Sequence, residues 1–155
     1  MLYPAFAPGQ GGQIVNREYQ AEQEVHQEPA RLLVVDDEHI SRDNLALVLA
    51  RQGYATVTAG SGEEALALLN STEFDLVLTD LMMPGMDGLA LVKAVKERQP
   101  DTEVVVITGY PTVDTAVQAM RAGAYDYLSK PYHLDEARII VHKALEKRLL
   151  RLEVA

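Results

Sequence analysis

The sequence predicts an α/β fold in which five parallel strands form a doubly wound sheet. Short apolar runs suited to strands alternate five times with longer stretches whose apolar residues recur at helical spacing. Of the 155 residues, 48% are apolar, which is enough for one sizeable core. Strict alternation of strands and helices implies parallel pairing, right-handed crossovers and helices on both faces of the sheet.

The first strand is predicted at residues 32–35, where a short and continuous apolar run is typical of a strand buried on both faces. Residues 54–59 are more polar and suit an edge strand. Three further strands are expected at residues 74–79, 104–107 and 125–128.

Five helices are predicted between and after these strands. The second has the clearest beginning, because Ser61 is a good N-cap residue and Glu64 completes the sequence pattern of a capping box. The first should end at Gly53, a residue favoured where helices terminate. The expected helices cover residues 40–51, 61–69, 89–98, 112–123 (beginning at Pro111 or Thr112) and 134 to about 150.

The chain divides into three parts. Residues 1–29 contain several prolines and glycines and a Gln/Glu-rich stretch, so we expect a mobile tail, with a short helix near 19–27 as an option. Residues 30–142 form the globular domain. Residues 143–155 extend its last helix.

Composition and charge exclude several classes of function. The 14 basic and 23 acidic residues give a net charge of −9, which argues against binding to nucleic acid or anionic lipid. Neither a membrane span nor a secretory signal is visible, so we expect a cytoplasmic protein. Cysteine is absent and the four histidines lack metal-ligand spacing, so the chemistry must come from carboxylates, hydroxyls and lysines.

Polar residues follow four of the five predicted strands. Asp36 and Asp37 follow the first strand, Asp80 ends the third, Thr108 ends the fourth and Lys130 follows the fifth. Parallel sheets bind ligands at the carboxyl ends of their strands, so these side chains should meet at one edge. Clustered carboxylates should raise one another's proton affinity and require a cation, Mg²⁺ before Ca²⁺. A lysine and a hydroxyl suit a compact anionic group bound beside them.

Three alternatives are weaker. A nucleotide site needs glycines after the first strand, where this chain has acidic residues at 36–38. A magnesium phosphatase of the haloacid-dehalogenase group needs an acid two positions after its nucleophilic aspartate, where this chain has Met82. Met82, Met83 and Met86 together raise the option of a soft-metal site, but their place beside carboxylates favours ordinary loop packing.

Four segments, in this order, resemble the receiver domain of two-component response regulators: VVDDE at 34–38, TDLMMPGMDG at 79–88, TG at 108–109 and AYDYLSKP at 124–131. The resemblance covers residues 31–149, and the stretch from 108 to 127 is most similar to NtrC-type, sigma-54-dependent regulators. It implies a flavodoxin-like (βα)5 fold with strand order 2-1-3-4-5. It also implies a cis peptide bond between Lys130 and Pro131.

The resemblance further implies that Asp80 accepts a phosphoryl group from a sensor histidine kinase or phosphotransfer protein. Mg²⁺ would be bound by the side chains of Asp37 and Asp80 and the backbone carbonyl of Met82, with Asp36 acting mainly through a coordinated water. No other cofactor is implied. Lys130 would pair first with Asp80 and then with the phosphoryl oxygens.

Two further residues would form the switch implied by the resemblance. Thr108 would donate its hydroxyl to the phosphoryl group, and Tyr127 would move inward behind it. Phosphorylation would then change the surface formed by the fourth helix, the fifth strand and the fifth helix, roughly residues 112–145. The chain would be a signalling domain rather than an enzyme, and a pseudo-receiver that acts only as an interaction module is the alternative.

The last helix carries one more prediction. Leu145, Leu149 and Leu152 are spaced four and then three residues apart, which begins a heptad seam. We therefore expect a homodimer in which this seam starts a coiled-coil linker, although a single amphipathic helix is the simpler interpretation. We expect a fragment of a larger regulator whose output is a transcriptional domain. A stand-alone receiver whose output is a partner protein is the alternative.

Overall fold

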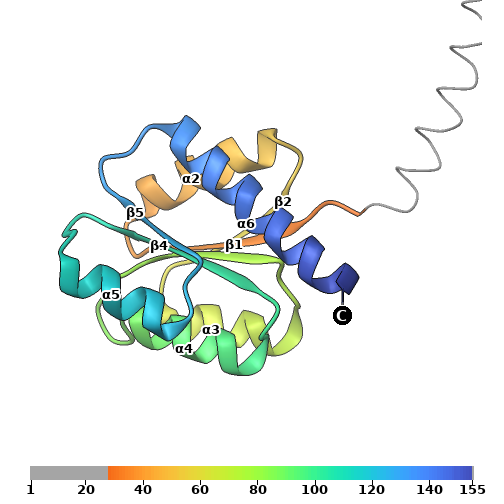
Figure 1. The fold of residues 1–155 in the computed structure, drawn as a ribbon. Helices are drawn as coiled ribbons and strands as arrows, with labels where there is room; N and C mark the ends of the chain where they lie inside the picture. The colour runs from red at the N-terminus through yellow and green to blue at the C-terminus, as the bar shows by residue number, and fades with distance from the viewer. Residues whose placement is uncertain (1–27, 155) are drawn as a thin grey trace, which may run out of the picture.

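Five parallel strands form one sheet in the order β2-β1-β3-β4-β5 in the computed structural model, which describes residues 28–154 (Figure 1). The strands are β1 (Arg31–Val35), β2 (Ala55–Ala59), β3 (Leu76–Asp80), β4 (Glu103–Thr108) and β5 (Asp126–Ser129). The predicted fold class and strand order are confirmed. The proposed tail lies outside the described residues except for 28 and 29, and so does the optional helix at 19–27.

Helices cover both faces of the sheet (Figure 1). They are α2 (His39–Arg51), α3 (Gly62–Ser71), α4 (Gly88–Arg98), α5 (Val113–Ala122) and α6 (Leu134–Val154). Helices α2 and α6 pack on one face, and α3, α4 and α5 pack on the other. This arrangement places an apolar layer on each side of the sheet.

The burial of the strands follows their place in the sheet. Every residue of the central strand β3 is buried, whereas β2 at the edge alternates exposed and partly buried residues up to Ala59. Strand β3 begins two residues later than predicted. Phe74, which is 1% exposed, donates its backbone N–H to the Gln99 side chain at 3.0 Å and so lies before the strand. The sequence pattern does not distinguish a buried apolar residue just before a strand from the strand itself.

The helix ends depend on local hydrogen bonds. The Ser61 hydroxyl accepts from the Glu64 N–H, as predicted, but the Glu64 carboxylate accepts from Gly60 N–H rather than from Ser61 N–H. The reciprocal capping box occurs instead at the start of α5, between Thr112 and Thr115. Gly53 follows α2 with φ of +100°, a left-handed conformation that glycine adopts without steric cost.

Helix α6 continues to Val154, about four residues beyond the predicted end. Its inner face is apolar at first, with Ala137, Val141 and Ala144 buried against the sheet. Further along the helix, two arginines lie on the same face. Arg148 pairs with Asp75 at 2.7 Å, and Arg151 contacts the acidic groups of Asp101, just before β4, and of Glu103, its first residue.

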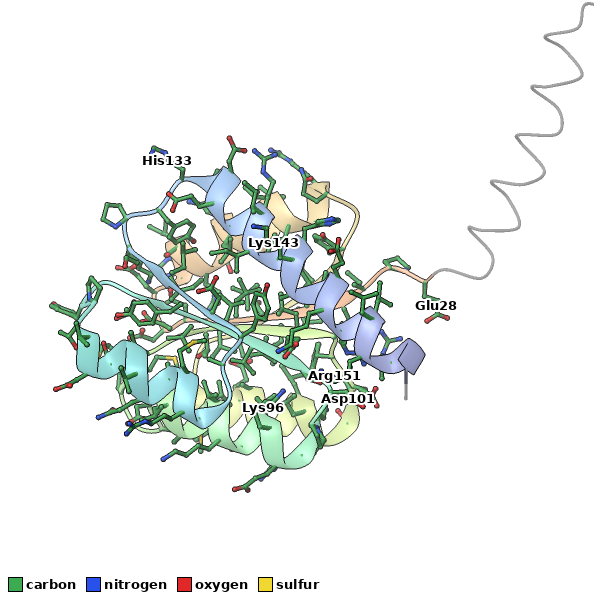
Figure 2. All side chains as sticks on the ribbon, viewed as in Figure 1. Glu28, Lys96, Asp101, His133, Lys143 and Arg151 are labelled. Atoms are coloured by element: carbon green, nitrogen blue, oxygen red, sulfur yellow. The ribbon has the colours of Figure 1, made fainter. Side chains whose placement is uncertain are left out.

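Glu103 is the centre of this acidic group. Its carboxylate is 1% exposed and lies 3.5 to 3.7 Å from cationic atoms of Lys96, Lys147 and Arg151. Figure 2 shows Arg151 and Asp101 together near the C-terminal end of α6, with Lys96 of α4 nearby. Ion pairs therefore hold the last turns of α6 against the amino ends of the strands. No helix among residues 28–154 is both long and apolar enough to cross a membrane.

We predict that Glu103→Gln lowers the free energy of unfolding by about 2 kcal/mol, because it leaves three cations without their shared buried anion. Urea denaturation of the full chain measures this loss. The control is Glu73→Gln, since Glu73 also pairs with α6 through Arg148 but its side chain is 77% exposed. That variant should change stability by less than about 0.5 kcal/mol. Equal losses in the two variants would contradict the role given to burial.

Candidate functional site

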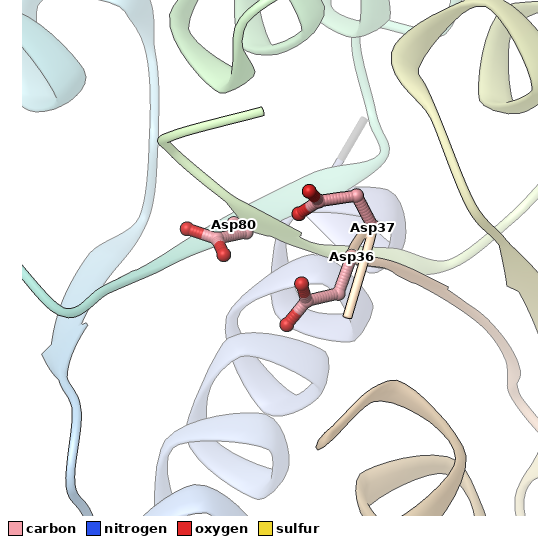
Figure 3. Close-up of side chains that lie close together, drawn as sticks. All are labelled: Asp36, Asp37 and Asp80. Carbon is pink, nitrogen blue, oxygen red and sulfur yellow. The ribbon is translucent and has the colours of Figure 1, made fainter. Parts of the chain in front are cut away.

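Three aspartates meet at the carboxyl edge of the sheet. Asp36 and Asp37 directly follow β1, and Asp80 is the last residue of β3. Strands β1 and β3 are paired in parallel, with Val35 opposite Thr79, so their carboxyl ends lie side by side. One carboxylate oxygen from each aspartate lies within 4.8 Å of the other two. Figure 3 shows the three side chains approaching one another from these neighbouring strand ends.

Backbone amides orient two of these carboxylates. Asp36 Oδ1 accepts from the N–H of Glu38 at 3.0 Å, and Asp80 Oδ1 accepts from the N–H of Met82 at 3.1 Å. In each case the donor is two residues further along, the short turn that aspartate forms readily with its own backbone. The turn after each strand therefore fixes the direction of the aspartate side chain at that strand end.

Lys130 joins the cluster from the loop after β5. Its Nζ lies 2.8 Å from Asp36 Oδ2 and 3.2 Å from Asp80 Oδ2. Its backbone N–H donates to the carbonyl of Thr108 at 2.7 Å, which fixes the loop to the end of β4. The resemblance implied the contact with Asp80, but the shorter contact with Asp36 was not predicted. The Lys130–Pro131 peptide bond is cis.

Burial and charge shift the pKa values at the site. Burial raises the pKa of Asp80, and the negative charge of Asp36 raises it further, while the Met82 N–H and the Lys130 ammonium act in the opposite direction. Repulsion between carboxylates, the cause expected from the sequence, is therefore smaller than burial. Burial by itself lowers the pKa of Lys130, but the hydrogen bonds and charges of Asp36 and Asp80 outweigh it, so this pKa is raised.

The donor set suits a small, hard cation. All three side chains offer carboxylate oxygens, the ligands preferred by Mg²⁺, and the cluster opens into a cleft from which water can complete the coordination. Asp37 is exposed and points one ligand to this cluster, whereas Asp36 is 5% exposed and already bonded at both oxygens. This difference is consistent with Asp37 as a direct ligand and Asp36 as an indirect one.

The cleft has a volume of about 520 Å³ and is also lined by residues outside the aspartate cluster. His39 and Glu38, at the start of α2, line one part of it, and Tyr110 lines another. Met82 also lines the cleft and is 56% exposed. Met83 and Met86 differ from Met82 because they pack in or against the apolar core, which supports loop packing rather than a soft-metal site.

The two expected switch residues lie beside the cluster. Thr108 ends β4 and is fully buried, and its Oγ1 accepts from the N–H of Tyr110 at 3.1 Å. Tyr127 lies on β5 opposite Val106, and its hydroxyl is 3.2 Å from Thr115 Oγ1 at the start of α5. Their roles as a switch stay predictions.

Comparison with known proteins identifies the family. The profile of the response regulator receiver domain matches residues 32–142. The chain is 41% identical over 124 residues to regulatory protein AtoC of Escherichia coli (strain K12), covering 80% of this chain and 27% of AtoC. It is 45% identical over 112 residues to the DNA-binding transcriptional regulator NtrC of Salmonella typhimurium, covering 72% of this chain and 24% of NtrC. The chain thus spans about a quarter of the length of these relatives.

A solved structure agrees with the observed fold. The CheY-like receiver domain protein from Methanospirillum hungatei JF-1 superposes with a TM-score of 0.78 at 27% identity. The match covers 80% of this chain and 99% of that one. The resemblance seen in the sequence is confirmed by these comparisons, including its NtrC-like character.

We predict that millimolar Mg²⁺ raises the melting temperature by a few degrees and that Asp37→Ala abolishes this response. Binding at ten times Kd stabilises the folded state by about 1.4 kcal/mol. Thermal unfolding with and without Mg²⁺ measures the effect. The control is Asp43→Ala, which removes an exposed aspartate of α2 that pairs with Arg42 outside the cluster and should keep the response. An unchanged response in Asp37→Ala would move the cation away from this site.

Proposed function

The chain belongs to the response regulator receiver domain family, and from that premise we propose that it is a signalling switch whose phospho-acceptor is Asp80. The observation that carries the proposal is the shared ammonium of Lys130, which contacts Asp80 and Asp36 within a cluster of three carboxylates. This cluster lies at the carboxyl edge of the sheet, where parallel α/β folds bind their ligands.

The proposed phosphoryl donor is a phosphohistidine of a sensor kinase or a phosphotransfer protein. A carboxylate oxygen of Asp80 attacks phosphorus, the P–O bond forms, and the P–N bond breaks with its electron pair returning to the imidazole. Because a carboxylate is a weak nucleophile, positioning and charge neutralisation must supply most of the rate. Bound Mg²⁺ would offset the negative charge on the phosphoryl oxygens, with Asp37, Asp80 and the carbonyl of Met82 as its proposed ligands.

Lys130 and Thr108 then bind the phosphoryl group in this proposal. Asp36 keeps the Lys130 ammonium in place at 2.8 Å while the lysine exchanges its Asp80 contact for a phosphoryl oxygen. The Thr108 oxygen accepts from Tyr110, so its own O–H remains a donor for the new group. Movement of the loop after β4 would bring this donor closer, and Tyr127 would follow it.

The proposed output is a changed surface on α5, β5 and α6. The Tyr127 hydroxyl lies 3.2 Å from Thr115, which also forms the capping box of α5, so a movement of Tyr127 would disturb the start of that helix. The net charge of −9 argues against direct binding of nucleic acid by this chain, so we propose that it does not contact DNA itself. The output would be a transcriptional domain or a partner protein, as the names of the relatives suggest, and the location would be cytoplasmic.

A homodimer is part of the proposal because α6 leaves an apolar stripe uncovered. Leu149 is 59% exposed and Leu152 is 40% exposed, while Leu145 is partly buried at the start of the stripe. Arg148 and Arg151 form their ion pairs on the inner face of the helix, beside this stripe. A second copy of α6 would cover the stripe as the beginning of a coiled coil.

The experiment that tests the proposed function is mass measurement after incubation with a small phosphodonor and Mg²⁺. We expect the wild type to gain one phosphoryl group and Asp80→Asn to gain none. Asp87→Asn is the control, because Asp87 is an N-cap in the same loop and should leave labelling intact. Equal labelling of wild type and Asp80→Asn, or no labelling of either, would favour the pseudo-receiver.

We predict slow self-dephosphorylation. Met82 and Tyr110 line the cleft and are 56% and 71% exposed, but neither side chain carries a carboxylate or amide that would orient the attacking water. The double variant Met82→Asn, Tyr110→Glu should hydrolyse several times faster, as followed by the decay of the phosphorylated mass. The control Met82→Leu, Tyr110→Phe should stay slow. An unchanged half-life in the polar variant would contradict the prediction.

We also predict that Leu149→Ser, Leu152→Ser weakens dimerisation while leaving the melting temperature of the monomer nearly unchanged. Both side chains are exposed, so their loss removes contacts with a second copy rather than with the domain. Sedimentation over a range of concentrations, with and without phosphorylation, measures association. A wild type that is monomeric under every condition would refute the coiled-coil linker.

A further inference from the structure

We propose that Glu63 is a positioning residue that acts on the phospho-acceptor site through the loop between β3 and α4. This inference rests on the proposed function, because the loop carries Met82, whose carbonyl is a proposed ligand of Mg²⁺. Glu63 itself lies in the first turn of α3 and does not touch the aspartate cluster. Its effect would be exerted through the backbone of the loop at Met86.

The contact joins two segments that are far apart in the sequence. Glu63 Oε1 accepts a hydrogen bond from the N–H of Met86 at 2.9 Å. Glu63 lies two residues after the N-cap Ser61, where a negative charge is favoured by the dipole of the helix. The carboxylate is therefore kept near the start of α3, and it supplies an acceptor to a loop amide.

Two glycines allow the segments to come this close. Gly85 has φ of +75°, and a Cβ atom there would lie 3.1 Å from Glu63 Oε1. A Cβ atom on Gly62 would lie 2.9 Å from the Cβ of Met86. A side chain at position 62 would clash with the Met86 side chain, and one at position 85 would crowd the Glu63 carboxylate. The backbone is thus shaped on both sides of the hydrogen bond to accommodate it.

The other end of the loop is fixed directly behind Asp80. The carbonyl of Leu81 accepts from the N–H of Gly88 at 2.9 Å. A Cβ atom on Gly88 would lie only 2.2 Å from the carbonyl oxygen of Asp80, so the chain must return close to the strand there. Met82 lies between this closed base and the tip at Met86. With both ends held, its backbone has little freedom to move.

Loss of the tip contact would therefore affect Met82 more than it affects the fold. Glu63 is exposed, so removing its side chain should cost little stability. A loop fixed only at its base would instead sample several shapes. Residues that orient the ligands of a metal commonly change its affinity by about 10–100-fold when they are replaced. The effect should appear in Mg²⁺ affinity rather than in the melting temperature of the metal-free protein.

The test compares Glu63→Ala, Glu63→Gln and Glu64→Ala in the full chain. Glu64 is the matched control, since it lies in the same helical turn but its carboxylate accepts from Gly60. Hydrogen exchange at the Met86 amide reports the contact, calorimetric titration gives the Mg²⁺ affinity, and labelling by a small phosphodonor gives the rate. We expect Glu63→Ala to lose protection at Met86 and to bind Mg²⁺ roughly tenfold more weakly. Glu63→Gln keeps an acceptor oxygen and should restore both, and Glu64→Ala should match the wild type.

Three results would overturn the role of Glu63. The first is lost protection at Met86 with unchanged Mg²⁺ affinity. The second is equal weakening in Glu63→Ala and Glu64→Ala, which would assign the effect to charge near the helix. The third is a Glu63→Gln variant as weak as Glu63→Ala. These outcomes differ from failure of the proposed function, in which the wild type itself neither binds Mg²⁺ nor takes up a phosphoryl group, and which would overturn both proposals.

Discussion

The Lys130 ammonium, shared between Asp36 and Asp80, is the interaction on which the site depends. Asp36 is 5% exposed and Asp80 is 9% exposed, and two carboxylates so close together would repel each other without a cation between them. The lysine comes from the loop after β5, so the contact unites three strand ends that are distant in sequence. Its backbone bond to Thr108 connects the fourth strand to the same arrangement.

The three aspartates of the cluster differ in their contacts and in their exposure to solvent. Asp36 holds the ammonium at the shorter distance and is itself fixed by the Glu38 amide, so it can keep the lysine in place when another anion competes for it. Asp80 holds the ammonium at the longer distance and faces the cleft. Asp37 is exposed, which in the proposed site would let a bound cation keep much of its water. Three aspartates thus have three environments, set by their position along two strands.

The fold class and the residues of the aspartate cluster could be predicted from the sequence. The fold class follows from the periodicity of apolar residues, and the cluster follows from the polar residues at the strand ends. The alternation of apolar runs with helical spacing predicts the layers, and the strand order implied by the family resemblance places β1 beside β3, which brings Asp36, Asp37 and Asp80 together. Two contacts between residues distant in the sequence were not predicted. The bond from Lys130 to Asp36 spans 94 residues, and the bond from Met86 to Glu63 spans 23. No local pattern marks either one, since each requires the loops to be placed first.

The ionic attachment of α6 has a mechanical consequence. A helix of 21 residues is about 30 Å long, so a tilt of only a few degrees at its start moves its far end by about 2–3 Å. Helix α6 begins near the aspartate cluster and ends at the opposite edge of the sheet, where Arg148 and Arg151 meet Asp75 and Glu103. The ion pairs of Arg148 and Arg151 would therefore oppose such a tilt at the far end of the helix. Because dissolved salt weakens exposed ion pairs, ionic strength would change how firmly the end of α6 is held against the sheet.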